Sequence, residues 1–399
     1  MLKTFNEPAR PALPATALPV LALGFRPFFL LAAALGAAGM GLWLGMWTAG
    51  ASFGNGYGLI HWHGHEMLFG YAAAVVAGFL LTAVRNWTGV NTPNGGALAL
   101  LALLWLLGRL LPWFAGWLPA PLIAFIDLAF LPTLALALKG PLWQGKPRVN
   151  RIFVPILLAM ALANLLFHLE PLGIAATAQQ GNDVMLLLLV LLIAILGGRV
   201  MPFFAQSALP GFKPRRFEWA EQGTLWVLAA LALVQAALPS PWLIAPLAVA
   251  AAVTQAVRFY GWHEGRVWSR PILWVLYAGF GWLVFGLFLW SLAAVGLAPP
   301  SLARHALTVG GVGVVTLGMM ARVCLGHTGR PMQPPKYVEW SFVALNLAAA
   351  VRVFGPWLAP ERFNLWLHLS GGVWMLCFLA FLFHYAPILL QPRPDGQAG

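Results

Sequence analysis

The chain has 399 residues, of which 61% are hydrophobic and only 9% are charged. Its mean hydropathy of +0.80 leaves too little polar surface to cover a water-soluble globule of this length, which excludes a soluble enzyme or binding domain. The formal net charge of +12 does not indicate a nucleic-acid partner, because the basic residues are not clustered in a hydrophilic domain with interleaved aromatic residues. We therefore expect the protein to lie in a lipid bilayer.

Apolar segments of about 20 residues, the length that a helix needs to cross a bilayer core, recur along the whole chain. The expected spans are 27–47, 63–84, 95–111, 118–139, 152–169, 183–204, 222–238, 242–260, 271–296, 305–325, 337–358 and 364–388. They are continuously apolar and lack the alternation of β-barrel strands. The sequence predicts an all-α, polytopic bundle of twelve helices, with one transmembrane domain (27–390), an N-terminal segment (1–26) and a C-terminal tail (391–399).

The basic residues indicate the orientation of this bundle. With the N-terminus in the cytoplasm, 19 of the 23 Lys and Arg residues fall on the cytoplasmic side. The four on the outer side are Arg109, Arg304, Arg352 and Arg362. This asymmetry follows the positive-inside rule, so we expect both termini in the cytoplasm.

Six of the nine histidines lie toward the outer side in this topology. They are His61, His63 and His65 at the start of the second span, His168 at the end of the fifth, His305 at the start of the tenth and His368 in the twelfth. Imidazoles from four helices at one depth are what a metal or haem site in a bundle core requires. We take these six as candidate metal ligands; the alternative is that each only hydrogen-bonds loop carbonyls and headgroups. The other three, His263, His327 and His384, lie at the inner side.

The triplet H-W-H-G-H allows two geometries. In a regular helix, His61 and His65 share a face and His63 points elsewhere. Gly64 weakens a helix at this point, so an irregular start that aims all three imidazoles inward is the alternative. Glu66 follows directly, and a carboxylate at membrane depth needs a partner or a role in proton transfer.

Copper, haem iron and zinc all accept imidazole ligands. The outer arginines favour haem, because its propionates are anionic; Arg109, Arg304 and Arg352 are the candidate partners, and snorkelling of each to the headgroups is the alternative. No C-x-x-C-H sequence is present, so any haem should be b-type.

Further polar and small residues lie deeper in the spans. Asp127, near the middle of the fourth span, should pair with an arginine such as Arg109 or line a proton path. Asp127 and Glu66 are therefore the candidate catalytic proton carriers. Asn164 lies in the outer part of the fifth span. The tenth span carries Gly310, Gly311, Gly313 and Gly318, which would let a helix or a flat macrocycle approach closely.

These residues belong to motifs that resemble the NnrS family over nearly the whole chain. The matching blocks are GFRPFFLLA from Gly24, HGHEMLFGYAAAVVAGFLLTAVRNWTG from His63, GGRVMPFF from Gly197, HALTVGGVGVVTLGMMARVCLGHTGR from His305 and YAPILLQPRPDG from Tyr385. The second and fourth blocks are long and specific. Chance similarity between apolar helices would not reproduce H-x-H-E-M or L-G-H-T-G-R.

The resemblance implies a bacterial inner-membrane protein that contains haem and copper and relieves nitrosative stress by acting on nitric oxide. His63, His65 and Glu66 match the H-x-H-E-M motif, and His305 opens the H-A-L-T segment. His327 belongs to the L-G-H-T-G-R motif. The family often has a histidine in the ninth span where this chain has Tyr277, which leaves the metal inventory open.

We therefore predict that haem b, and also copper, are held by His63, His65 and His305 together with some of the other outer histidines, and that nitric oxide binds there. Reduction of two nitric oxide molecules to nitrous oxide would also need electrons, and the sequence has no flavin or iron-sulfur motif. Quinol or another electron donor would have to supply them. The alternatives are a twelve-helix secondary transporter and a sensor of metal or nitric oxide that carries out no catalysis.

Overall fold

A computed structural model describes residues 18–51, 57–146 and 148–396. Within these ranges the protein is all-helical, with no strand, and 83% of the chain is helix. Twelve helical spans are long and apolar enough to cross a membrane, which confirms the predicted class and the predicted number of spans. Most of the predicted N-terminal segment, residues 1–17, and the last three residues of the predicted tail lie outside the described residues.

The spans have the following bounds. They are α1 (Phe25–Ala49), α2, η2 and α3 (Leu59–His65, Glu66–Ala72, Ala73–Thr88), α4 (Gly95–Leu110), α5 (Ala120–Gln144), α6 (Phe153–His168), α7 (Ala178–Ala208), α8 (Glu218–Ala237), α9 (Pro241–Trp262), α10 (Pro271–Ala294), α11, η6 and α12 (Pro300–His305, Ala306–Gly313, Val314–His327), α13 (Lys336–Leu358) and α14 (Phe363–Leu390). Short 3₁₀ helices are η1 (Pro19–Leu21), η3 (Leu111–Phe114), η4 (Arg148–Ile152), η5 (Gly265–Ser269) and η7 (Pro360–Arg362).

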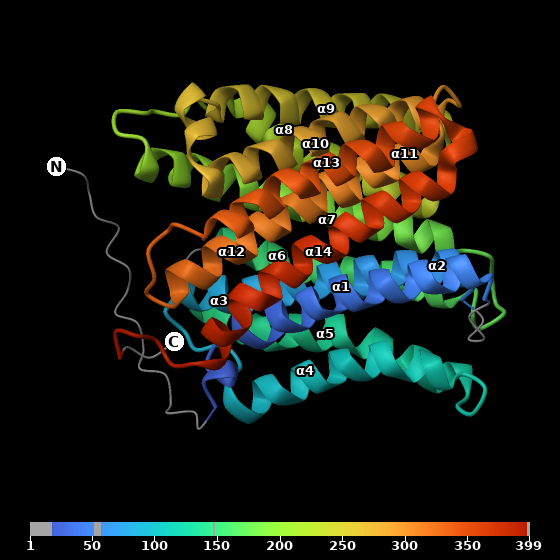
Figure 1. The fold of residues 1–399 in the computed structure, drawn as a ribbon, viewed down its shortest axis with the longest axis horizontal. Helices are drawn as coiled ribbons and strands as arrows, with labels where there is room; N and C mark the ends of the chain where they lie inside the picture. The colour runs from blue at the N-terminus through green and yellow to red at the C-terminus, as the bar shows by residue number, and fades with distance from the viewer. Residues whose placement is uncertain (1–17, 52–56, 147, 397–399) are drawn as a thin grey trace.

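The helices form one elongated bundle (Figure 1). Helices α4 and α5 lie at one edge, and α8 and α9 lie at the opposite edge. Neighbours along the chain pack against each other, and α14 returns to pack on α1. We call the end of the bundle where α1 finishes and α2 begins the distal end; all six histidines predicted to lie on the outer side are at this end.

Three spans lie in the centre of the bundle. The share of residues buried in the most apolar window is 89% for Leu59–Thr88, 78% for Ala178–Ala208 and 72% for Pro300–His327, higher than for the other spans. Two of these central spans contain a π-helical segment, η2 and η6, each starting directly after a histidine. π-Helical turns are rare in proteins, and those that occur are often found at functional sites.

The glycines of η6 and α12 serve helix packing. A Cβ on Gly310, Gly311 or Gly318 would lie about 2.5 Å or less from side-chain atoms of α10, and one on Gly313 would lie 2.5 Å from the Trp374 ring of α14. These four positions therefore admit the side chains of neighbouring helices, which is one of the two roles that the sequence suggested.

Gly181 of α7 tests how tightly the central spans are packed. A Cβ there would lie 2.5 Å from the backbone nitrogen of Phe167 and 2.7 Å from the carbonyl oxygen of Ala163, and neither atom can move without shifting α6. We expect Gly181→Ala to lower the free energy of unfolding by about 1–3 kcal/mol, measured by unfolding in detergent. Gly45→Ala is the control, because nothing lies within 4 Å of a Cβ at that position. Equal stability of the two variants would contradict the close approach of α6 and α7.

Candidate cofactor sites at the distal end

The histidine triplet is helical, and its side chains lie on two faces of α2. His61 and His65 both face α6 and the loop after it: His61 Nδ1 lies 3.3 Å from Glu170, and His65 contacts His168, with ring centroids 5.5 Å apart. His63 instead stacks on Trp43 of α1, with centroids 4.2 Å apart. The first of the two predicted geometries is therefore the one that the structure adopts. The triplet contributes to two separate sites.

The first site is a buried polar cluster around Asp127 of α5. His65 Nε2 lies 3.1 Å and His168 Nε2 lies 2.8 Å from the same carboxylate oxygen, Oδ2. Asn164 donates its Nδ2–H to that oxygen at 2.9 Å, and its Oδ1 lies 3.0 Å from His65 Nε2. All four residues are at most 3% exposed. Helices α2 and α6 thus bring three polar groups to one carboxylate oxygen on α5.

Arg109 of α4 contributes a positive charge to this cluster. Its Nη2 donates to Asp127, as the sequence suggested, and its Nη1 donates to Glu66 Oε1 at 3.1 Å. Two glycines leave room for these contacts. A Cβ on Gly108 would lie 2.7 Å from Asp127 Oδ1, and one on Gly70 would lie 3.1 Å from both Arg109 and Glu66.

The charges of the cluster do not balance when both imidazoles are neutral. When both are ionised, the carboxylates of Glu66 and Asp127 bring two negative charges, and Arg109, which contacts both, offsets one of them. An unbalanced charge buried at membrane depth is costly. One further positive charge, either a monovalent cation or a proton on an imidazole or a carboxylate, would make the cluster neutral.

The same residues could hold a metal ion. His65, Asp127 and His168 each offer one ligand atom, and these atoms all lie within 4.8 Å of one another. His168 Nδ1 is buried and has no hydrogen-bond partner among the residues that the structure describes. Tyr57 packs against both imidazoles, with ring centroids 5.7 and 5.8 Å away. Two imidazoles and a carboxylate suit copper, iron or zinc.

The second site is a cavity of about 300 Å³ at the distal end, which we call the distal cavity. His63 of α2 and His305 of α11 both line it. Its aromatic lining residues are Trp43, Trp47, Tyr71, Phe363 and Trp374. An apolar cavity of this size with a few polar groups is typical of a site for a cofactor or small ligand.

Several polar atoms of the cavity's lining residues lack a partner in the described part of the chain. They are Nδ1 of His63, Oδ1 of Asn182 and Nε1 of Trp43. Buried polar groups normally have a hydrogen-bond partner, and these three groups of one cavity have none within the described part of the chain. His305 differs, because its Nδ1 lies 2.6 Å from the carbonyl oxygen of Ser301. That contact leaves Nε2 available, as in histidines that bind metals.

The predicted arginines lie in different surroundings. Arg304 lines the distal cavity but forms a two-pronged ion pair with Asp183, at 2.7 and 2.8 Å. Arg352 also lines the cavity and has no acidic partner among the described residues; its guanidinium lies 5.6 Å from the centroid of the Phe363 ring. Arg109 does not line this cavity. Among the described residues that line the cavity, Arg352 is thus the arginine without an acidic partner, and Arg362 is exposed outside the cavity.

The remaining candidates lie outside both sites. His61 is about one-third exposed, and His368 is exposed, with Nε2 2.8 Å from the Thr48 hydroxyl. Tyr277 lies toward the opposite end of the bundle and donates its hydroxyl to the carbonyl oxygen of Trp262. The three inner histidines, His263, His327 and His384, also lie at that end.

Some residues of these sites had no signal in the sequence. Trp43 is one of 20 tryptophans, and its position within α1 does not reveal that it stacks on His63. Asp183 lies at the predicted start of the sixth span, where an acidic residue reads as an ordinary interfacial group. Only its pairing with Arg304 across the bundle shows that it shapes the distal cavity.

A comparison with models of protein families shows to which family the chain belongs. The family model described as NnrS protein matches residues 19–393. The chain belongs to the NnrS family. This membership supports a membrane protein of the nitric oxide response. No curated protein matches the chain.

Removing the charge of Arg109 should destabilise this NnrS protein strongly. Arg109→Met leaves two buried carboxylates without their cation, and we expect it to cost about 3–5 kcal/mol in unfolding free energy. Arg304→Met is the matched control, because the Arg304 side chain is about one-third exposed and its ion pair with Asp183 should contribute less. If unfolding in detergent showed a smaller loss of unfolding free energy for Arg109→Met than for Arg304→Met, Arg109 would not be the cation that stabilises the two carboxylates of the cluster.

Proposed function

We propose that this protein binds haem b in the distal cavity and copper in the Asp127 cluster, and that it captures nitric oxide within the membrane. The observation that carries the proposal is that His63 and His305, from two different helices, line one aromatic cavity that is also lined by Arg352, which has no acidic partner in the described part of the chain. Each histidine immediately precedes or lies close to a π-helical segment. The role in the nitric oxide response follows from family membership.

The residues of the distal cavity fit a b-type haem. His305, anchored through Nδ1, and His63, whose Nδ1 has no described partner, would hold the iron. Arg352 would neutralise a propionate, and the tryptophans would cover the macrocycle. Haem iron supplies a site at which nitric oxide binds. The protein's own part is to exclude water and to hold the imidazoles in place.

The Asp127 cluster fits a cuprous ion. His65 and His168 would be its imidazole ligands, with Asp127 as the carboxylate. With both carboxylates ionised, Cu⁺ would bring the single positive charge that neutralises the cluster. Arg109 remains bound to both carboxylates in this arrangement.

Nitric oxide is small and apolar, so it can reach a site inside the membrane through lipid. Binding of nitric oxide needs no other reactant, whereas its reduction to nitrous oxide consumes protons and electrons. Glu66 and Asp127 are the buried carboxylates that could carry protons. Electrons for reduction would come from quinol or another donor.

We place the protein in the inner membrane of a bacterium, with both termini in the cytoplasm and both sites near the outer leaflet. The distribution of Lys and Arg supports this orientation. Membership of the NnrS family does not favour the secondary transporter. The joints between spans contain no soluble output domain in the described part of the chain, which makes a sensor the weaker alternative.

The haem ligands can be tested with a control on the same helix. We expect His63→Ala and His305→Ala to lose most of the haem absorption of the purified protein, because each removes an imidazole from the distal cavity. His61→Ala and His368→Ala should keep the wild-type Soret band, because both side chains lie outside the cavity. Wild-type haem content in both cavity variants, or a haem-free wild-type protein, would show that the assignment is wrong.

Copper should depend on a different histidine. His168→Ala removes one ligand of the Asp127 cluster, so we expect copper affinity to fall by at least about tenfold while the haem spectrum stays unchanged. Metal analysis of the purified protein, after equilibration with cuprous ion under reducing conditions, measures this. Loss of haem together with copper would mean that the two sites are not separate. Copper binding to His168→Ala at wild-type affinity would show that the Asp127 cluster is not the copper site.

A further inference from the structure

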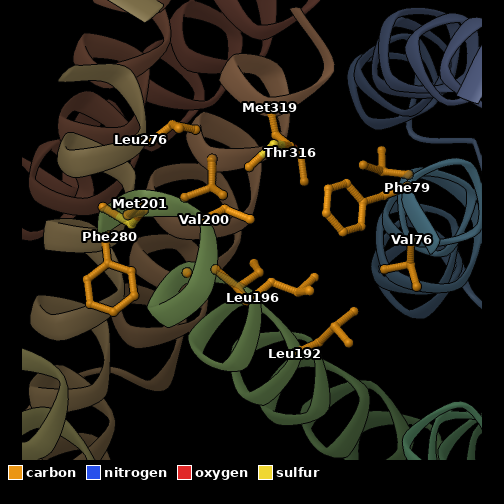
Figure 2. A pocket seen from close by; sticks show the side chains of 14 residues that line it. Val76, Phe79, Leu192, Leu196, Val200, Met201, Leu276, Phe280, Thr316 and Met319 are labelled. Carbon is orange, nitrogen blue, oxygen red and sulfur yellow. The ribbon is translucent and has the colours of Figure 1, made fainter. Parts of the chain in front are cut away.

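A second cavity of about 70 Å³ lies deeper in the bundle, and we call it the inner cavity. Figure 2 shows its lining: Val76 and Phe79 project from α3, Leu192 and Leu196 from α7, and Met319 from α12. Thr316 is the one lining residue with a polar side chain. Its hydroxyl is used elsewhere, since it donates to the carbonyl oxygen of Val312 at 2.6 Å and lies 2.5 Å from the Tyr71 hydroxyl. The cavity therefore offers nothing to which water could hydrogen-bond.

The inner cavity is aligned with the distal cavity along the same three spans. Tyr71, Leu186 and Val312 line the distal cavity. Four to six residues further along the same helical spans, Val75, Leu192 and Thr316 line the inner one. One hydrogen-bonded pair links the two linings, because Tyr71 belongs to the first and Thr316 to the second. This pair lies at the boundary between the two cavities.

We propose that the inner cavity is a docking site for a diatomic gas, and that gas passes from it to the distal cavity beside the Tyr71–Thr316 pair. The identification of the gas as nitric oxide rests on the proposed function. The existence of the docking site rests only on the cavity.

Size and polarity select this occupant. A water molecule needs two to four polar partners, and cavities lined only by apolar groups stay dry and take up gases such as xenon. A volume of about 70 Å³ is too small for a cofactor or a quinone ring but leaves room for a diatomic molecule. Part of the lining is fully enclosed, since Phe280 is fully buried and Leu276 and Leu192 are 1 and 2% exposed, whereas Phe79, Leu196 and Val200 are partly exposed.

Xenon tests the docking site without reference to haem. Purified full-length protein in detergent or nanodiscs is equilibrated with xenon, and bound xenon is located in a structure determined under xenon pressure. We expect one xenon site among Val76, Leu192 and Met319 in the wild type. We expect its loss in Val76→Phe, which places a ring in the cavity. Absence of xenon from the wild-type cavity, or an acyl chain in its place, overturns the proposal.

Matched variants separate filling of the cavity from general damage. Val253→Phe is the control, because this side chain is 49% exposed on α9, outside the inner cavity. It should retain the xenon site. If Val76→Phe does not fold, Leu192→Phe fills the cavity from α7 instead, with the exposed Leu233→Phe as its control. A xenon site that survives in a folded cavity-filling variant would also overturn the proposal.

Nitric oxide kinetics test the passage. Where haem is present, the cavity-filling variant should slow nitric oxide association several-fold after photolysis, while haem content and the Soret band remain unchanged. Tyr71→Phe, which removes the hydrogen bond to Thr316, should change the same rate while leaving the xenon site in place. Unchanged rates in both variants overturn the passage. A haem-free protein that still binds xenon would contradict the proposed function but support the docking site.

Discussion

Lipid offers no hydrogen bonds and little stabilisation of charge, so the polar side chains inside this bundle must satisfy one another or bind a ligand. Around Asp127 they nearly do: Arg109, His65, His168 and Asn164 all contact one carboxylate, and a single negative charge remains when Glu66 and Asp127 are both ionised. Around the distal cavity they do not, because polar atoms of His63, Asn182 and Trp43 lack partners among the described residues. The difference between these two environments is the basis for assigning a small cation to one and a larger cofactor to the other.

The two sites share one helix but not one face. His63 and His65 are two residues apart, so α2 directs them to opposite sides, and the wide turn η2 follows at once with Glu66 and Tyr71. Tyr71 in turn contacts Thr316 at the boundary of the inner cavity. A short stretch of one central span thus contributes to the Asp127 cluster, the distal cavity and the boundary with the inner cavity. This arrangement provides a physical reason for the dense H-x-H-E-M-x-x-x-Y pattern in the sequence.

The sequence was sufficient for the fold, because hydropathy is a strong signal in lipid. All twelve spans were predicted, although the second begins at Leu59 rather than 63 and the sixth extends over Ala178–Ala208 rather than 183–204. Both errors have one cause: polar residues such as His61 and Asn182 lower the hydropathy at the helix ends. The sites were predicted only in part. The predicted topology placed the histidines at one depth. It could not show that His65 and His168 meet at Asp127 while His63 and His305 line the distal cavity. That separation depends on the rotation of each helix.

The central claim is that imidazoles of two separate sites bind two different cofactors at the distal end. Its most direct test is an experimental structure of the protein purified from its own membrane with its cofactors retained. The account predicts macrocycle density in the distal cavity, bounded by His63, His305 and Arg352, and a separate ion between His65 and His168. A haem bound elsewhere, or a distal cavity filled by lipid in a preparation that contains haem, would contradict it.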